Sequence, residues 1–308
     1  MRASAPAKVM LFGEYAVLEG HRSLAMCLDR RILCSVERGG GRLRVESEGI
    51  FDPPVDLPAS VLEKPDCPDA RLRLLWPVLR RHADSGGLSL RFEAQFPPVW
   101  GLGSSSASTL AAAGALAGPG EERFDEVLSA QRGVQGSASG YDVATQLLGG
   151  YVLYRGGEEP EMERLDVPEL SWLLAWTGDK VSTGAMIGEV RNRFPIGDPI
   201  YRQIGALTEV AIELLSGGHR SALGEAMNQG QELLARLGAV PTELASQVRS
   251  LQAEPSVYGA RMTGAGGGDS VLLLVSDPVA AAQKVASVGF ELLELRPEFE
   301  GLRWENAS

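Results

Sequence analysis

The chain has 308 residues and carries 40 Asp and Glu against 29 Lys and Arg, a formal net charge of -11. This acidic balance argues against nucleic acid as a partner, because binding to a phosphate backbone requires clustered cations. Only three His are present, so a histidine-based zinc site or a Ser-His-Asp triad is not expected. A hydrophobic fraction of 44% is typical of a globular protein, and the length fits two compact domains or one large one.

Membrane and export signals are not expected either. No apolar run approaches the roughly 20 residues of a membrane-spanning helix, and Met1–Pro6 does not begin a secretory signal. Cys27, Cys34 and Cys67 lack metal-binding spacing, which favours free thiols in a reducing compartment. We therefore expect a cytoplasmic protein without a membrane partner, either a monomer or a homodimer.

The first half of the chain shows strand and helix signals without a regular βαβ alternation. Gly39–Gly41 separates two strand-like runs and predicts a hairpin turn, whereas the Pro- and Asp-rich segment 50–69 predicts a loop. An Ala-rich helix is expected to follow the Gly- and Ser-rich residues 101–106 and to run to about Leu116. The other expected strands are 7–12, 31–37, 42–47, 88–93 and 151–154, and the other expected helices are 121–132 and 142–148.

The second half of the chain is richer in long helical patterns. We place a domain boundary in the Gly- and Glu-rich stretch after Tyr154, with domains 1–158 and 159–308. The expected helices are 182–194, 199–216, 219–236, 241–253 and 278–287, and the expected strands are 170–176, 257–263, 270–275 and 290–295. Together the two halves predict an α+β protein.

The strongest motif is the Gly/Ser loop, Gly101–Ser106, which precedes the Ala-rich helix. Gly101 and Gly103 allow the backbone to approach a phosphate closely, and the helix adds its positive N-terminal end. Leu102, Ser104, Ser105 and Ser106 complete the loop. No Gly-Lys-Ser/Thr sequence closes it, so it is not a Walker loop. The alternative is a Ser N-cap after a flexible turn.

A second glycine-rich segment, the C-terminal glycine loop (Gly264–Gly268), lies between two predicted strands. Four of its five residues are glycine, whereas an ordinary hairpin turn needs one or two. Close approach of the backbone to a ligand would account for the excess. A mobile loop without a ligand is the alternative.

Two charged residues are candidates for catalysis. Asp142 follows Ser139 at the start of a predicted helix, where a carboxylate can stabilise the helix dipole or act on a substrate hydroxyl. Lys8 begins a predicted strand. Such a lysine is commonly a solvated edge residue, but an inward side chain could neutralise a transferring phosphoryl group.

These segments together resemble the GHMP kinases, the family of galacto-, homoserine, mevalonate and phosphomevalonate kinases. The motifs around Lys8, Gly101–Ser106 and Gly264–Asp269 occur in the family order and span nearly the whole chain. The resemblance implies a ribosomal-protein-S5-like N-terminal domain and a ferredoxin-like C-terminal domain. It implies ATP bound at the Gly/Ser loop, with Ser105 as a Mg²⁺ ligand and Lys8 and Asp142 as catalytic residues. The residues expected at the substrate are Ser139, Gly264, Ala265, Gly266, Gly267 and Asp269.

Within the family, three segments are similar to the phosphomevalonate kinase branch: Gly13–Leu18, Gly264–Asp269, and Trp176-Thr177-Gly178 with Ser182-Thr183. The resemblance therefore implies transfer of the ATP γ-phosphoryl group to phosphomevalonate, a small anionic substrate. Mevalonate as the acceptor, and a GHMP-fold protein that binds its ligand without turnover, are the alternatives.

Some positions depart from the family pattern. Gln131 lies where mevalonate kinases carry a metal-binding Glu, and Ala7, Arg261 and Ser270 replace the common Gly, Lys and Cys. A phosphorylated acceptor also requires cations. Lys180 is the first candidate, and Arg191 and Arg193 are others, although a solvated surface charge is the more common role for any one of them.

Overall fold

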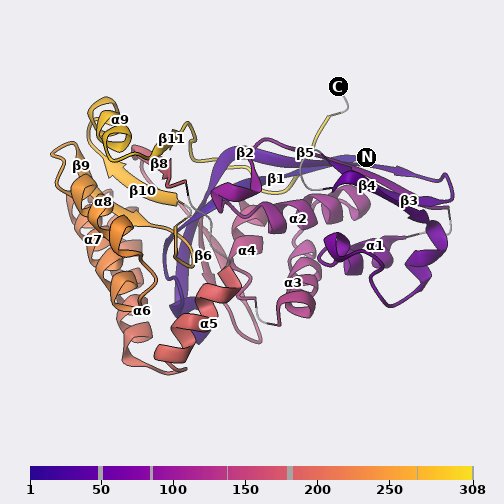
Figure 1. Ribbon diagram of the computed structural model, residues 1–308, viewed down its shortest axis with the longest axis horizontal. Coiled ribbons are helices and arrows are strands. Elements are labelled where there is room, and N and C mark those ends of the chain that lie inside the picture. Colours follow the sequence, from indigo (N-terminus) through magenta and orange to yellow (C-terminus); the bar gives the residue numbers. More distant parts are fainter. Residues whose placement is uncertain (48–50, 84–85, 137, 179–182, 269, 307–308) are drawn as a thin grey trace.

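Two β-sheets organise the chain into two lobes, which lie side by side in Figure 1. The structure, a computed structural model, describes residues 1–47, 51–83, 86–136, 138–178, 183–268 and 270–306. The N-terminal lobe holds an eight-stranded sheet and the C-terminal lobe a four-stranded sheet. This arrangement agrees with the α+β class expected from the sequence.

The larger sheet is antiparallel except for one pair, β3 and β5. Its strand order is β12-β1-β2-β5-β3-β4, and β6 pairs with β2 and with β7. The strands are β1 (Arg2–Phe12), β2 (Arg22–Arg38), β3 (Arg42–Ser47), β4 (Phe51–Pro58), β5 (Leu88–Ala94), β6 (Tyr151–Arg155), β7 (Glu161–Leu165) and β12 (Arg303–Trp304). β2 is long enough to pair with β6 near its start and with β5 near its end.

Two expectations for this sheet were wrong. Gly39–Gly41 does not close a hairpin, because β5 lies between β2 and β3 and pairs with both. Segment 50–69 is not all loop, since Phe51–Pro58 forms β4 at the edge of the sheet. Proline is tolerated in an edge strand because the missing N–H faces no partner. The Pro-rich composition of this segment therefore concealed a strand.

Four helices belong to the N-terminal lobe: α1 (Trp76–His82), α2 (Ser104–Ala117), α3 (Arg123–Gln135) and α4 (Tyr141–Leu148). α2 packs on β1 and β2, and all its residues from Ser106 to Leu116 are buried. Its small alanine side chains allow close approach to the sheet, which explains an Ala-rich helix at the centre of a lobe. The expected helices here are confirmed, whereas α1 was not predicted.

The C-terminal lobe confirms most of the expected elements. Its sheet has the order β11-β8-β10-β9, from β8 (Trp172–Trp176), β9 (Val257–Met262), β10 (Ser270–Val275) and β11 (Glu291–Leu293). The helices are α5 (Thr183–Arg193), α6 (Pro199–Ser216), α7 (Arg220–Arg236), α8 (Thr242–Gln252) and α9 (Pro278–Ser287). None of the helices in the described ranges has both the length and the apolar character needed to cross a membrane.

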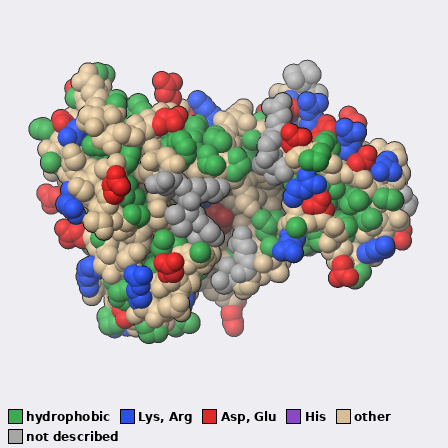
Figure 2. Space-filling view, viewed as in Figure 1, with side chains coloured by type: hydrophobic (Ala, Val, Ile, Leu, Met, Phe, Trp, Pro, Cys, Tyr) green, Lys and Arg blue, Asp and Glu red, His purple; other side chains and the backbone are tan. Residues whose placement is uncertain are grey.

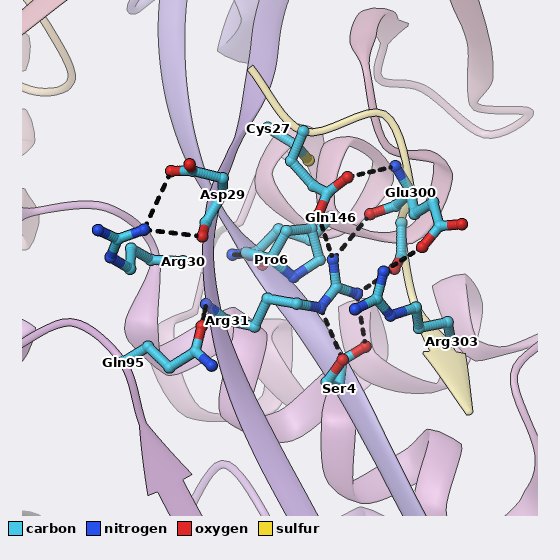
Figure 3. A network of polar contacts seen from close by, with 12 residues as sticks. Ser4, Pro6, Cys27, Asp29, Arg30, Arg31, Gln95, Gln146, Glu300 and Arg303 are labelled. Carbon is cyan, nitrogen blue, oxygen red and sulfur yellow. Dashed lines mark hydrogen bonds and ion pairs between the residues drawn. The ribbon is translucent and has the colours of Figure 1, made fainter. Parts of the chain in front are cut away.

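The end of the chain returns to the N-terminal lobe. β12 pairs with β1, and Arg31 of β2, 4% exposed, holds the returning segment. Its guanidinium donates to the carbonyl oxygens of Ser4, Glu300 and Gly301 (Figure 3). The domain boundary after residue 158 stays a prediction; β7, which follows it, extends the larger sheet.

Candidate active site

The Gly/Ser loop leads directly into α2, and the start of this helix has no capping side chain among the described residues. Gly103 precedes α2 with a φ of 78°, and no side chain in the described ranges caps the helix. The first-turn N–H groups of a helix have no partner within the helix itself. Ser106 is buried and donates its hydroxyl to the carbonyl of Gly103, whereas Ser105 is exposed. The geometry suits a phosphate at Ser104–Ser106.

The same loop is fixed to β1. The Lys8 N–H donates to the carbonyl of Leu102 over 3.0 Å. Gln146 of α4, fully buried, donates its amide to the carbonyls of Pro6 and Gly103 over 2.9 and 3.0 Å. Gly103 leaves no room for a side chain, because a Cβ atom there would lie 2.8 Å from Lys8 Cε. The Lys8 side chain therefore lies directly against the Gly/Ser loop.

Lys8 points inward, which was one of the two alternatives left open by the sequence. Its side chain is 7% exposed, and Nζ donates to Tyr141 Oη over 3.0 Å and lies 5.1 Å from the ring centroid. Burial raises the pKa of Tyr141, while the positive charge of Lys8 opposes this shift. A buried ammonium group beside an uncapped helix start is a suitable arrangement for neutralising phosphate charge.

A cavity of about 110 Å³ opens between the two lobes, where Figure 2 shows the surface to be hollowed. It brings together five residues expected from the sequence: Lys8, Gly101, Ser139, Gly264 and Ala265. Residues not expected there also line it, among them Glu14, Tyr15, Tyr141 and Ile187 of α5. Both glycine-rich loops thus meet at one cavity, although they lie far apart in the sequence.

Glu14 contributes a buried carboxylate to this cavity. It is 2% exposed and pairs with Arg261 of β9, also 2% exposed, over 2.6 Å. Burial raises the pKa of Glu14, and the Arg261 charge and hydrogen bond oppose the rise. The second carboxylate oxygen, Oε1, has no hydrogen-bond partner among the described residues. The pair joins the N-terminal lobe to the strand that leads into the C-terminal glycine loop.

The C-terminal glycine loop uses its glycines for different purposes. Gly264 lines the cavity with a φ of 80° and open space beside it. Gly266 has a φ of 107°, and a Cβ atom there would lie 2.5 Å from the Ala239 carbonyl oxygen. Gly267 donates its N–H to the same carbonyl over 2.8 Å. Gly266 and Gly267 thus pack against Ala239, whereas Gly264 leaves the cavity open.

Asp142 lies in the first turn of α4, next to Tyr141, but it does not line the cavity in the described structure. Its Oδ1 accepts from the N–H of Val143 over 3.0 Å, the helix-stabilising role. Its Oδ2 accepts from Nε2 of Gln131, a residue of α3 that is 3% exposed, over 3.2 Å. A buried amide thus orients the carboxylate, and the catalytic role expected for Asp142 stays a prediction.

The arginines expected from the sequence near the substrate do not line the cavity. Arg191 forms an ion pair with Glu19 over 2.9 Å, and neither Arg191 nor Arg193 lines the cavity. Lys180 and Asp269 lie outside the described residues. Lys8 is therefore the single cation among the described lining residues.

Comparison with known proteins assigns the chain to a family. Residues 72–150 match the family model "GHMP kinases N terminal domain" and residues 211–292 match "GHMP kinases C terminal". A mevalonate kinase of Thermococcus sibiricus is 31% identical over 99% of this chain and 98% of its own length. The chain belongs to the GHMP kinase family. Its resemblance to these kinases, expected from three motifs, is confirmed.

Solved structures of GHMP kinases show the same fold. Methanococcus jannaschii mevalonate kinase aligns with a TM-score of 0.80 at 20% identity, over 99% of this chain and 98% of that one. Streptococcus pneumoniae phosphomevalonate kinase, in complex with phosphomevalonate and AMPPNP, aligns with a TM-score of 0.81 at 17% identity, over 96% and 99%. At these identities the similarity establishes the fold, not the substrate.

Sequence reasoning missed several residues of this GHMP kinase site. Tyr141 directly precedes Asp142, so the start of α4 could have suggested it as a neighbour of the ligand. Glu14 and Tyr15 belong to a motif used for the family resemblance, but their contacts with Arg261 and Ala265 depend on how the lobes meet. Gln146 offered no local signal, because its two partners lie far away in the sequence.

The side-chain oxygen atoms of the candidate site indicate whether it could hold a divalent metal ion. In the part of the chain that the structure describes, no cluster of three or more His, Cys, Asp or Glu could hold a metal ion. Ser105 offers an exposed hydroxyl, and Gln131 Oε1 is buried without a hydrogen-bond partner among the described residues. Mg²⁺ commonly takes only one or two protein ligands and completes its shell with nucleotide phosphates and water. The exposed Ser105 hydroxyl therefore offers one protein ligand for a Mg²⁺ ion that arrives with a nucleotide.

Proposed function

We propose that this GHMP kinase transfers the γ-phosphoryl group of ATP to the hydroxyl group of mevalonate. The observation that carries the proposal is Lys8, a buried ammonium group between the uncapped start of α2 and the cavity. Full-length similarity to mevalonate kinases supports the acceptor. Motif resemblance alone favoured phosphomevalonate, so the two acceptors need a direct comparison.

The charge of the cavity supports an acceptor that is not yet phosphorylated. Its described lining holds one cation, Lys8, and one carboxylate, Glu14. A phosphate monoester brings about 1.5 to 2 negative charges near neutral pH, in addition to those of ATP. An alcohol acceptor with a single carboxylate makes a smaller demand on so few cations.

In the proposed mechanism the first-turn N–H groups at Ser104–Ser106 bind nucleotide phosphates. Lys8 stabilises negative charge on the transferring group. Asp142, held by the Gln131 amide, accepts the proton of the attacking hydroxyl. Gly264 and Ala265, together with Ser139, position the acceptor at the cavity. Mg²⁺ bound with the nucleotide, and held by Ser105, would neutralise phosphate charge.

Phosphomevalonate is the second candidate acceptor. It is favoured by the Gly13–Leu18 segment, which resembles the phosphomevalonate kinase branch, and by Gln131, which stands where mevalonate kinases have Glu. A phosphate acceptor is already ionised, so it depends less on a catalytic base. Lys180 would be the cation for its phosphate.

The experiment is an ADP-release assay with Mg-ATP and mevalonate, phosphomevalonate, galactose or homoserine. Asp142→Asn is compared with Asp125→Asn, which removes an exposed carboxylate from the first turn of the neighbouring helix α3. We expect turnover of mevalonate, with kcat lowered roughly 100- to 10,000-fold by Asp142→Asn and not by Asp125→Asn. Preferred turnover of phosphomevalonate, with a mild effect of Asp142→Asn, supports the second candidate. Nucleotide binding without turnover of any acceptor contradicts both.

A further inference from the structure

Tyr15 has a backbone conformation that tyrosine rarely adopts. Within the ranges that the structure describes, it is the only residue other than glycine with a positive φ, at 64°. Bulky side chains avoid this region because Cβ meets the backbone, and only glycine enters it freely. Gly13, two residues earlier, adopts a φ of 101° as expected for glycine. A tyrosine retained in such a conformation indicates that its side chain has a specific use.

The Tyr15 side chain reaches from the N-terminal lobe into the C-terminal lobe. It is 5% exposed and packs in a cluster otherwise made of C-terminal residues, including Tyr201 and Ile204, with the single addition of Ala16. Its hydroxyl donates to the carbonyl oxygen of Ala265, in the C-terminal glycine loop. Both Tyr15 and Ala265 line the cavity. Burial raises the pKa of Tyr15, so the hydroxyl keeps its proton and stays a donor.

We propose that Tyr15 is a positioning residue that holds the C-terminal glycine loop at the cavity through the Ala265 carbonyl. The loop is tied to its own lobe by the Gly267–Ala239 hydrogen bond. Beyond the loop, Ser270 donates its hydroxyl to the Trp100 carbonyl over 3.0 Å, immediately before the Gly/Ser loop. Tyr15 and Ser270 therefore hold the C-terminal glycine loop from opposite ends, and Tyr15 acts on the segment that faces the cavity.

The physical reason lies in the glycine content of the loop. A segment with four glycines has high conformational entropy when it is not held, and phosphoryl transfer depends on precise positioning of both ligands. A hydrogen bond from a residue fixed in the other lobe selects one loop conformation. The expected effect of Tyr15 on kcat/KM rests on the proposed phosphoryl transfer. Its expected effect on the conformation of the loop does not.

The test compares Tyr15→Phe with Tyr201→Phe. Tyr201 is a matched control because it is 2% exposed, belongs to the same cluster, and donates its hydroxyl to the Phe194 carbonyl over 2.6 Å, away from the cavity. Both variants lose one buried hydroxyl and keep the ring. The measurements are hydrogen–deuterium exchange of the peptide spanning Gly264–Gly268 and kcat/KM with Mg-ATP and the preferred acceptor.

Tyr15→Phe is expected to speed exchange in the loop and to lower kcat/KM roughly 3- to 10-fold, the effect of one neutral hydrogen bond. Tyr201→Phe is expected to leave both unchanged. Ser270→Ala, which removes the separate link to Trp100, is expected to speed loop exchange as well. Loop exchange equal to wild type in Tyr15→Phe, or equal changes in Tyr15→Phe and Tyr201→Phe, would overturn the proposal. The exchange measurement needs no acceptor, so it decides the role of Tyr15 even if the proposed function is wrong.

Discussion

Replacing Gly103 by Ala perturbs the contact between the Gly/Ser loop and Lys8. The new Cβ atom would lie 2.8 Å from Lys8 Cε, 3.1 Å from Lys8 Cγ and 3.0 Å from Gln146 Nε2. The shortest of these separations is closer than real Cβ atoms approach other heavy atoms, so the lysine side chain must move. The amide of Gln146, which bonds to the Gly103 carbonyl, must move with it.

The substitution Gly103→Ala has two expected effects, a loss of folding free energy from the backbone and a loss of rate from displacement of Lys8. A φ of 78° at residue 103 disfavours any residue with a Cβ atom, at about 1–2 kcal/mol. Displacement of a catalytic group by about 1 Å can lower the rate about 100-fold. A substitution at Gly289 distinguishes these two effects. Gly289 has a φ of 87°, and no atom lies within 4 Å of the place that a Cβ would occupy. Gly289→Ala should therefore share the backbone penalty without touching the site.

The assay combines denaturant unfolding with initial rates of ADP release. We expect both variants to lose about 1–2 kcal/mol of unfolding free energy, and only Gly103→Ala to lose about 100-fold in kcat. Equal kcat values for Gly103→Ala and Gly289→Ala would refute the reasoning, since they would mean that the position of Lys8 does not limit phosphoryl transfer.

Two further predictions concern residues outside the loop. Gln131→Leu removes the amide that donates to Asp142 while keeping the side-chain volume; kcat should fall roughly 3- to 10-fold with KM for ATP unchanged, and an unchanged kcat would contradict an orienting role. Arg31→Ala removes the buried guanidinium that holds the end of the chain; the unfolding free energy should drop by about 3–5 kcal/mol. Arg30→Ala, whose side chain is 37% exposed, should cost about 0.5 kcal/mol or less, and equal losses in both variants would argue against the network.

The family and the approximate position of most elements could be predicted because their signals are local. The Gly/Ser loop and the Ala-rich helix after it are adjacent in the sequence, and a helix start follows from that adjacency. The helices of the C-terminal lobe have regular apolar patterns and well-placed ends, such as Asp198 capping α6. Strand pairing was less predictable: β3 follows β2 closely but pairs with β5, which lies beyond β4 and α1 in the chain.

The residues of the candidate site also fall into those that local sequence patterns predicted and those that only the packing of the lobes revealed. By itself the sequence determined the chemical groups, Lys8, the two glycine-rich loops and Asp142, because each belongs to a motif of a few consecutive residues. Only the tertiary structure decided which of them share a cavity, that Lys8 points inward, and that Tyr15 and Glu14 reach the opposite lobe. These contacts depend on how two lobes pack, and each joins residues too distant along the chain for any local pattern to specify.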